Sequence, residues 1–442
     1  MSTSLQEPTG LRGRWATWSA RPDVRRVGSA IGIALALALI TGPKGNENDR
    51  WQGIRGSFLD VRVVWFVLGG LLLGLALNQR ERVRGAVAAA ARPLDGVRDR
   101  YRTDARLRYA VYGLLLVVAV FAPQLVSPYW QRVLTDQVGI YVLLALGLNV
   151  VVGLAGLLDL GYIAFFAIGA YTTAYFTDRL PVSPPVTLNP FLIMPIAIAA
   201  AMLAGVLLGS PTLRLRGDYL AIVTLGFGEI VRIVAVNSDK LTNGPQGAFG
   251  IPHFSAFGYH WTLESMPYYY LLLVVILFTV FLFHRLEESR IGRFWTAIRE
   301  DEVAAAASGV PTLRFKLLAF AIGASTSGFA GVIYASKIGF INPDNFPLLL
   351  SILVLTMVIF GGMGSMLGVI LGAAALGLLP EVMRDYVPAE DRYIWFGALL
   401  IVMMVFRPQG LVPSRRRARE IKLSEEGIGG ADSLGATPGA QA

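Results

Sequence analysis

Long apolar runs constrain this chain more than any other feature. A bilayer span needs about 20 apolar residues, and most of the runs approach that length. The chain is 54% hydrophobic and 16% charged, more apolar than a soluble core could absorb. We therefore predict an all-α polytopic integral membrane protein with about 10–12 transmembrane helices. The runs are residues 27–41, 63–77, 109–126, 138–157, 160–176, 191–209, 219–236, 268–284, 317–336, 348–363, 366–380 and 393–406.

The first two runs are shorter than a comfortable span. Residues 27–41 and 63–77 each have about 15 residues, below the usual length. They either begin earlier than drawn, thin the bilayer or lie partly in the interface. The first 20 residues lack the apolar core of a cleavable signal peptide.

Basic residues predict the orientation. With the N-terminus in the cytoplasm, 28 of the 39 Lys and Arg residues fall in cytoplasmic segments and 10 in outer segments, while Arg232 stays in a span. Cytoplasmic loops carry such an excess. We expect both termini in the cytoplasm, residues 285–316 on the same side and residues 237–267 outside.

The chain divides near residue 108. Residues 1–108 are an N-terminal extension with two apolar runs and an Arg-rich linker at 78–108. Residues 109–412 form the predicted core. The tail at 413–442 is rich in Gly, Ala, Ser and charge, so we expect it to be disordered.

The loop at residues 285–316 is a charged amphipathic insert between two apolar runs. Its helical segment ends at Gly309, with Pro311 two residues on, which is a common helix stop signal. An acidic cluster, Glu300 to Glu302, precedes several alanines. We predict one helix over Ala297–Gly309, exposed to a soluble partner. The alternative is an amphipathic helix on anionic lipid.

Polar residues inside apolar runs are candidates for a translocation path, because ionisable groups there usually face a cavity or a partner. Glu229 and Arg232 are three apart and therefore able to pair, and a structural ion pair is their alternative role. Asn149 and Asp159 bracket a glycine-rich stretch that either lines a pathway or forms a membrane turn. Lys337 and Asp344 are expected at the interface.

Small residues recur at helix-contact spacing. Gly364, Gly368 and Gly372 are each four apart, so we predict one face for close helix packing. Ser327, Gly331 and Ala335 repeat the pattern. Residues 348–380 are expected to form a hairpin or a pair of partly re-entrant helices.

Several function classes lack their sequence signals. The chain has no Cys, so thiolate metal sites and cysteine nucleophiles are excluded, and its three His residues have no ligand spacing. It contains no phosphate-binding P-loop and no hydrolase or dinucleotide motif. The basic charge sits in loops, where topology and anionic lipid explain it better than nucleic acid. We expect no catalytic residue, metal site or bound cofactor.

Seven ordered sequence blocks resemble one transporter family. They are L-G-L-N-V-V-V-G-L-A-G-L-L-D-L-G at 146–161, A-I-G-A-Y at 167–171, R-L-R-G-D-Y-L-A-I-V-T-L-G-F-G-E-I-V-R at 214–232, L-T-N-G-P-Q-G at 241–247, the loop A-I-R-E-D-E-V-A-A-A-A-S-G-V-P with K-L-L-A-F, F-G-G-M-G-S at 360–365 and F-R-P-Q-G-L at 406–411. Over residues 109–412 the chain resembles LivM-type permeases of branched-chain amino-acid ABC importers.

The resemblance implies a fold, a substrate and partners. It implies the ABC importer permease fold in a bacterial inner membrane and import of Leu, Ile and Val. The implied partners are a second, LivH-type permease, two cytoplasmic ATPase subunits that bind ATP, and an extracytoplasmic solute-binding protein.

The resemblance also implies a coupling loop. Its exposed contacts would be Ala297, Arg299, Glu300, Glu302 and Gly309. The general importer motif has Gly six residues after its Glu, whereas Glu302 stands seven before Gly309 and is followed by Val303. The register in the ATPase cleft is therefore left open.

Other functions stay open at this point. Urea or short-amide permeases share the fold and similar blocks. An ion-coupled secondary transporter would use buried carboxylates such as Glu229 and Asp159, but would not need the cytoplasmic insert. Neighbouring genes would distinguish an ABC importer from a secondary transporter, since the importer needs ATPase, permease and binding-protein genes nearby.

Overall fold

The chain divides into two compact units, of which only the second is described at length. One unit comprises Met1–Gly113 with Tyr393–Pro408, and the other, called the core unit below, comprises Leu114–Arg392 with Gln409–Ala442. The computed structural model describes residues 27–32, 35, 67, 71, 105–213, 217–256, 258–385, 392–406 and 409–412. The predicted runs at 27–41 and 63–77, the linker at 78–108 and the tail at 413–442 lie largely or wholly outside these residues.

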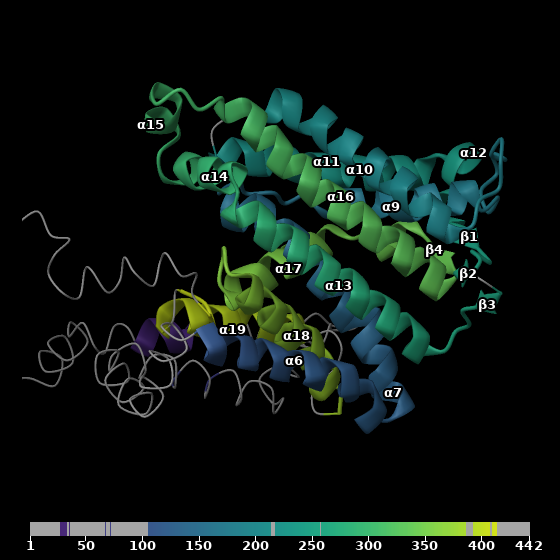
Figure 1. Ribbon diagram of the computed structural model, residues 1–442, viewed down its shortest axis with the longest axis horizontal. Coiled ribbons are helices and arrows are strands. Elements are labelled where there is room, and N and C mark those ends of the chain that lie inside the picture. Colours follow the sequence, from purple (N-terminus) through teal and green to yellow (C-terminus); the bar gives the residue numbers. More distant parts are fainter. Residues whose placement is uncertain are drawn as a thin grey trace, which may run out of the picture. The chain divides into compact units, whose positions relative to one another are not determined.

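The described residues form helices and a few two-residue strands (Figure 1). In chain order they are α6 (Ala105–Leu125), α7 (Pro128–Arg132), η1 (Val133–Gly139), α8 (Ile140–Leu148), η2 (Asn149–Leu154), α9 (Ile163–Phe176), α10 (Pro190–Thr212), α11 (Gly217–Asn237), α12 (Asp239–Thr242), η3 (Gly244–Gln246), β1 (Ala248–Phe249), β2 (Ser255–Ala256), β3 (Tyr259–His260), α13 (Ser265–Glu288), α14 (Arg290–Glu300), α15 (Glu302–Ala307), α16 (Thr312–Ile338), β4 (Phe340–Ile341), η4 (Pro343–Asn345), α17 (Leu348–Gly361), α18 (Met366–Val382) and α19 (Arg392–Phe406).

The polytopic membrane architecture predicted from the sequence is confirmed. Within the described residues, six helical stretches are long and apolar enough to cross a membrane, and three shorter apolar helices accompany them. Each of the nine runs drawn between residues 109 and 380 overlaps one of these stretches. The run at 393–406 is α19, which the structure groups with the first unit rather than with the core unit.

One helical stretch begins well before its apolar run. The helical stretch Pro128–Leu154 begins ten residues before the predicted start at 138. Pro128 sits at the first helical position after Ser127, where its missing N–H costs nothing. The stretch contains two wider π-helical segments, η1 and η2. Such segments are frequent at functional sites, and the second one adjoins the predicted coupling helix.

In the centre of the core unit, the backbones of neighbouring helices pack in direct contact. Helix α16 packs against α9 and α10, and glycines lie at the crossings. A Cβ on Gly169 of α9 would overlap the Gly328 carbonyl of α16, and one on Gly205 of α10 would stand 2.8 Å from the Ala324 Cβ. Ser327, Gly331 and Ala335 are all buried on α16. Close backbone approach of this kind is how helices associate in lipid.

Helices α17 and α18 form a hairpin, which was one of the two predicted arrangements. A Cβ on Gly372 would lie 2.6 Å from the Gly361 Cα, and one on Gly368 would overlap the Gly361 carbonyl. Gly364, however, is not on the helix. It lies in the turn before the N-cap Ser365, at φ +81°. The predicted single face of three glycines is therefore wrong at Gly364, because the turn needs a left-handed residue there.

The two loops expected on opposite sides lie at opposite ends of the core unit (Figure 1). Helices α14 and α15 occupy one end, and α12 with the short strands occupies the other. There β1 pairs antiparallel with β4, with Ala248 opposite Ile341, and β2 pairs with β3. Residues 285–316 and 237–267 are thus separated by the length of the spans.

The first prediction tests the glycine contact in the hairpin. Gly372→Ala should lower the unfolding temperature of the purified protein in detergent, because overpacking costs about 1–3 kcal/mol. Gly226→Ala is the matched control, since a Cβ at Gly226 of α11 meets nothing within 4 Å, and it should be neutral or mildly stabilising. Equal thermal stability of the two variants would contradict the packing.

The second prediction concerns orientation. The chain has no Cys, so single cysteines report accessibility directly. Leu263 and Val303 are 66% and 78% exposed. An impermeant maleimide applied to intact cells should label Leu263→Cys and should reach Val303→Cys only after permeabilisation, because basic loops stay inside. The reverse pattern would overturn the orientation.

Candidate functional site

The predicted coupling segment is two helices rather than one. Asp301 has extended backbone at φ −153°, and its side chain accepts hydrogen bonds from the Val303 and Ala304 amides, so it caps α15 and ends α14. Asp is among the preferred capping residues. The single helix predicted over Ala297–Gly309 is therefore wrong, because its middle acidic residue serves the backbone instead of a partner.

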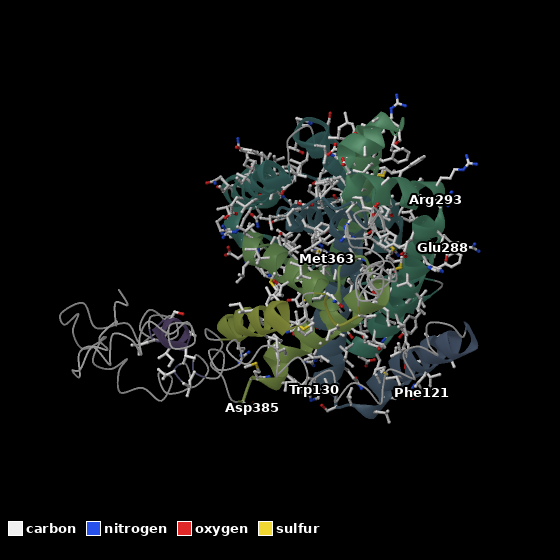
Figure 2. All side chains as sticks on the ribbon, turned by 90° about the vertical axis from the view of Figure 1, so that its left-hand side faces the viewer. Phe121, Trp130, Glu288, Arg293, Met363 and Asp385 are labelled. Carbon is white, nitrogen blue, oxygen red and sulfur yellow. The ribbon has the colours of Figure 1, made fainter. Side chains whose placement is uncertain are left out.

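The apolar face of α14 is used by the chain itself. Trp295 and Ile298 are buried, and Trp295 Nε1 donates to the Phe315 carbonyl of α16 at 2.7 Å. The ring of Phe294 lies 4.7 Å from that of Phe315. Figure 2 looks onto this end and shows Glu288 and Arg293 beside each other at its edge. Because its apolar face is packed against protein, α14 does not match an amphipathic helix that lies on lipid.

Arg299 connects α14 to the long span. The sequence predicted an exposed contact, and the residue is exposed, yet its Nη1 donates to the Gly153 carbonyl in η2. Its aliphatic stem lies against Gly156, where a Cβ would stand 2.7 Å from Arg299 Cγ. A cation at the carbonyl end of a helix is favourable. The guanidinium thus has a partner inside the chain.

Asn149 extends this contact to the hairpin. Asn149 is only 2% exposed, and its Oδ1 accepts a hydrogen bond from the Gly364 amide at 2.8 Å. A Cβ on Gly153 would overlap Asn149 Oδ1 and lie 2.6 Å from the Gly364 nitrogen. Asn149 therefore belongs to a junction of η2 with the α17–α18 turn and does not join the other predicted path residues. We call Asn149, Gly153, Arg299 and Gly364 the coupling junction.

The remaining predicted coupling residues have local roles. Lys316 is buried, and its Nζ donates to Glu302 Oε1, which holds α15 against the start of α16. Gly309 lies at φ +84° just after α15, so it closes the helix in a conformation that other residues adopt poorly. Ala297 is half-buried on α14, and Glu300 is exposed at its end.

Asp159 lies in the connection between η2 and α9 and is fully buried. Its Oδ1 accepts from the Gly161 amide at 2.9 Å, and the next amide, of Leu160, donates to Thr224 Oγ1 of α11 at 3.0 Å. A Cβ on Gly161 would overlap the Thr224 carbonyl. Burial raises the pKa of the Asp159 carboxyl to about 7, although hydrogen bonds from Gly161 and Thr224 oppose the rise.

Arg232 and Glu229 lie further along α11, toward the other end of the core unit. The predicted Glu229–Arg232 pair is wrong, because Arg232 Nη2 donates to Asp344 Oδ1 of η4 at 2.9 Å. Within the described residues, Glu229 Oε2 is buried without a hydrogen-bond partner, as is Asp159 Oδ2. Lys337, expected at the interface, is buried and donates to the Leu263 carbonyl.

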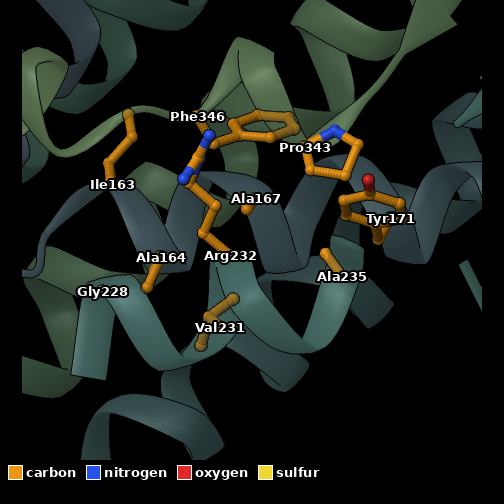
Figure 3. Close-up of a pocket in the computed structure, with 10 residues that line it drawn as sticks. All are labelled: Ile163, Ala164, Ala167, Tyr171, Gly228, Val231, Arg232, Ala235, Pro343 and Phe346. Atoms are coloured by element: carbon orange, nitrogen blue, oxygen red, sulfur yellow. The ribbon is translucent and has the colours of Figure 1, made fainter. Parts of the chain in front are cut away.

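A small pocket lies between α9, α11 and the η4 region (Figure 3). Arg232 and Tyr171 are its polar members, and the remainder of its lining is apolar. The lining residues are Ile163, Ala164, Ala167, Tyr171, Gly228, Val231, Arg232, Ala235, Pro343 and Phe346. Sequence reasoning missed Tyr171, because nothing in the local pattern distinguishes it from other aromatic residues of a span.

Comparisons with known proteins agree on one family. A family model described as branched-chain amino acid transport system, permease component, matches residues 133–406. The high-affinity branched-chain amino acid transport system permease protein LivM of Salmonella typhimurium is 41% identical over 330 residues, which cover 70% of this chain and 76% of that protein. LivM of Escherichia coli K12 is 42% identical over 330 residues, which again cover 70% of this chain and 76% of that protein.

A second type of permease is related over a shorter stretch. LivH of Escherichia coli K12 is 29% identical over 151 residues, which cover 34% of this chain and 47% of that protein. No solved structure matches the chain.

The third prediction follows from the buried carboxyl of Asp159. Its pKa is about 7 in the folded chain against 3.8 for an ordinary Asp. Ionisation therefore costs the folded state increasingly as pH rises from about 4 to about 7. Asp159→Asn retains the acceptor for Gly161 and removes this cost. The unfolding temperature of the variant relative to the natural chain should rise between about pH 5 and about pH 8, by about 2 °C or more. A difference that does not change with pH would contradict the shift.

Proposed function

Since the chain belongs to the family of permease components of branched-chain amino acid transport systems, we propose that it is the LivM-type subunit of an ATP-driven importer for Leu, Ile and Val. The chain has no P-loop, so ATP is hydrolysed by two separate cytoplasmic subunits. A LivH-type permease completes the path, and an extracytoplasmic binding protein delivers the amino acid. The membrane is the bacterial inner membrane, with both termini in the cytoplasm.

The observation that supports this proposal best is the coupling junction. An ATPase that closes beneath α14 and α15 needs a rigid element to push and a connection from that element to the spans. Trp295 makes α14 part of the core by packing on α16. Arg299 then ties the end of α14 to the Gly153 carbonyl. A secondary transporter would not need such an attachment at this end.

The junction provides a direct route into two membrane elements. A displacement of α14 moves the carbonyl end of η2 through Arg299. Asn149 sits one turn earlier on η2 and holds the Gly364 amide, so the α17–α18 turn follows. Tight contacts at Gly153 leave little room for these parts to slip past one another. Asp301 separates α14 from α15, so the docked helix and the more exposed helix are distinct elements.

The exposed surface that remains is the part offered to the ATPase. Val303 is 78% exposed on α15, and the charged side of α14 faces away from the core. Glu302 is half exposed while it holds Lys316. An exposed apolar residue beside a charged one fits a groove whose rim charges set register.

The fourth prediction tests the transmission step. In the complex reconstituted in liposomes, Arg299→Ala should leave assembly and basal ATP hydrolysis intact and should lower leucine uptake per ATP hydrolysed by at least about tenfold. A hydrogen bond from a charged group contributes about 1.5–3 kcal/mol, enough for such a loss. Arg299→Lys keeps a cation near the Gly153 carbonyl and should restore part of the coupling.

The control for this test is Arg179→Ala, since Arg179 is an exposed arginine beside Gly250, at the strand-bearing end of the core unit. It should couple normally. If Arg299→Ala also couples normally, α14 does not act through η2.

A further inference from the structure

Two of the sequence blocks, at residues 360–365 and 406–411, meet in the structure. The first block ends α17 and forms the turn to α18, and Figure 2 labels Met363 in this turn. From the second block, Gln409 to Leu411 lie against the same turn, together with Val412. We call Gln409–Val412 the strap. The described chain thus ends on the turn that belongs to the coupling junction.

The strap satisfies the end of α17. The last carbonyls of a helix have no partner within the helix. Here the Leu411 amide donates to the Phe360 carbonyl at 2.9 Å, and the Val412 amide donates to the Gly361 carbonyl at 3.0 Å. A distant part of the chain therefore supplies, through its backbone, what a local cap would otherwise supply.

Glycines allow the strap and the turn to touch. Gly410 is buried at φ +82°, and a Cβ on it would overlap the Gly362 Cα. Gly362 lies at φ +116°, and a Cβ there would stand 2.5 Å from the Val412 carbonyl oxygen. A Cβ on Gly368 of α18 would stand 2.8 Å from the same oxygen. Contacts this close leave the turn little room to shift while the strap is in place.

The coupling junction holds the same turn a second time. Gly364 lies two residues after Gly362, and its amide donates to Asn149 Oδ1 at 2.8 Å. The strap holds residues 360–362 and Asn149 holds residue 364, so the two fastenings lie on either side of Met363 in the sequence. Because a hydrogen bond depends on direction as well as distance, the backbone that the strap fixes decides how the Gly364 amide meets Asn149.

We propose that the strap is a positioning element for energy coupling, which holds the α17–α18 turn where Gly364 meets Asn149. The proposal rests on the importer function given above and adds a fourth segment of chain to the coupling junction. Without the strap, the turn would yield when η2 moves, and the hairpin would follow less. The hairpin itself would persist, since its contact between Gly361 and Gly372 does not involve the strap.

Hydrogen exchange of single amides tests the positioning without relying on transport. It is measured by mass spectrometry with electron-transfer fragmentation, on the complex in lipid nanodiscs. Leu411→Pro removes the donor to the Phe360 carbonyl, and Gly410→Ala places a Cβ against Gly362. In each variant the Gly364 amide should exchange about tenfold faster, which is about 1.4 kcal/mol of protection. Amides in the middle of α16 should exchange as before, which verifies that the core is intact.

Gly258→Ala is the matched control for Gly410→Ala. Gly258 also lies at φ +82°, but it is exposed between β2 and β3, and a Cβ on it meets nothing within 4 Å. The control therefore carries the same kind of backbone cost without the contact. Its Gly364 amide should exchange at the natural rate. Leu411→Ala keeps the backbone N–H and should retain most of the protection.

Coupling is measured on the same variants in liposomes, as leucine uptake per ATP hydrolysed. Leu411→Pro should lower this ratio about fivefold, the loss expected from one hydrogen bond of about 1 kcal/mol. Asn149→Ala should lower it as well. The double variant should be no worse than Asn149→Ala alone, because both changes release the same turn. A strap that only stabilises the fold would give losses that multiply.

Three results would overturn the proposal. The first is natural exchange at Gly364 in both strap variants. The second is faster exchange at Gly364 with normal uptake per ATP, which would make the strap a cap of α17 alone. The third is multiplying losses in the double variant. If uptake by the natural complex does not depend on ATP, the importer assignment fails, and the exchange rates alone then decide whether the strap positions the turn.

Discussion

The contact of helix backbones through small residues is the constraint on which the core unit depends. Lipid offers no hydrophobic drive for helices to associate, so close packing has to supply it. At the crossings of α9, α10 and α16, glycines remove the side chains that would hold these helices apart, as at Gly169 against Gly328. The same contact recurs at Gly361 and Gly372 in the hairpin. A centre held this tightly has little room to rearrange.

Within this apolar packing, the role of each buried polar group depends on the partners it contacts. A buried donor or acceptor in a membrane protein has few partners available, so those present define its role. Asn149 and Arg299 are each committed to a backbone group of another element, which makes them mechanical connections. Glu229, by contrast, has a buried oxygen with no protein partner among the described residues. Asn149 and Glu229, which were predicted together from their polarity, thus have different surroundings in the structure.

Local sequence patterns identified the spans and the coupling region but not the contacts between them. Apolar runs report burial in lipid, so nine spans were drawn within a few residues of their helices, except where Pro128 extended one. The break between α14 and α15 at Asp301 could also have been predicted from the sequence, because an Asp before a run of small residues is a capping signal. The partner of Arg232 lies 112 residues away and that of Arg299 lies 146 residues away. Spacing suggested Glu229 for Arg232, and tertiary structure supplied Asp344.

A single stretch of chain connects the coupling junction to α11. Gly153 at the end of η2 receives Arg299, and in the connection that follows, the Leu160 amide holds α11 at Thr224. In the proposed importer, a shift of α14 therefore displaces the segment against which α11 packs. Linkage makes such an effect reciprocal: if docking of the ATPase on α14 alters the position of α11, the position of α11 must alter docking of the ATPase by the same free energy.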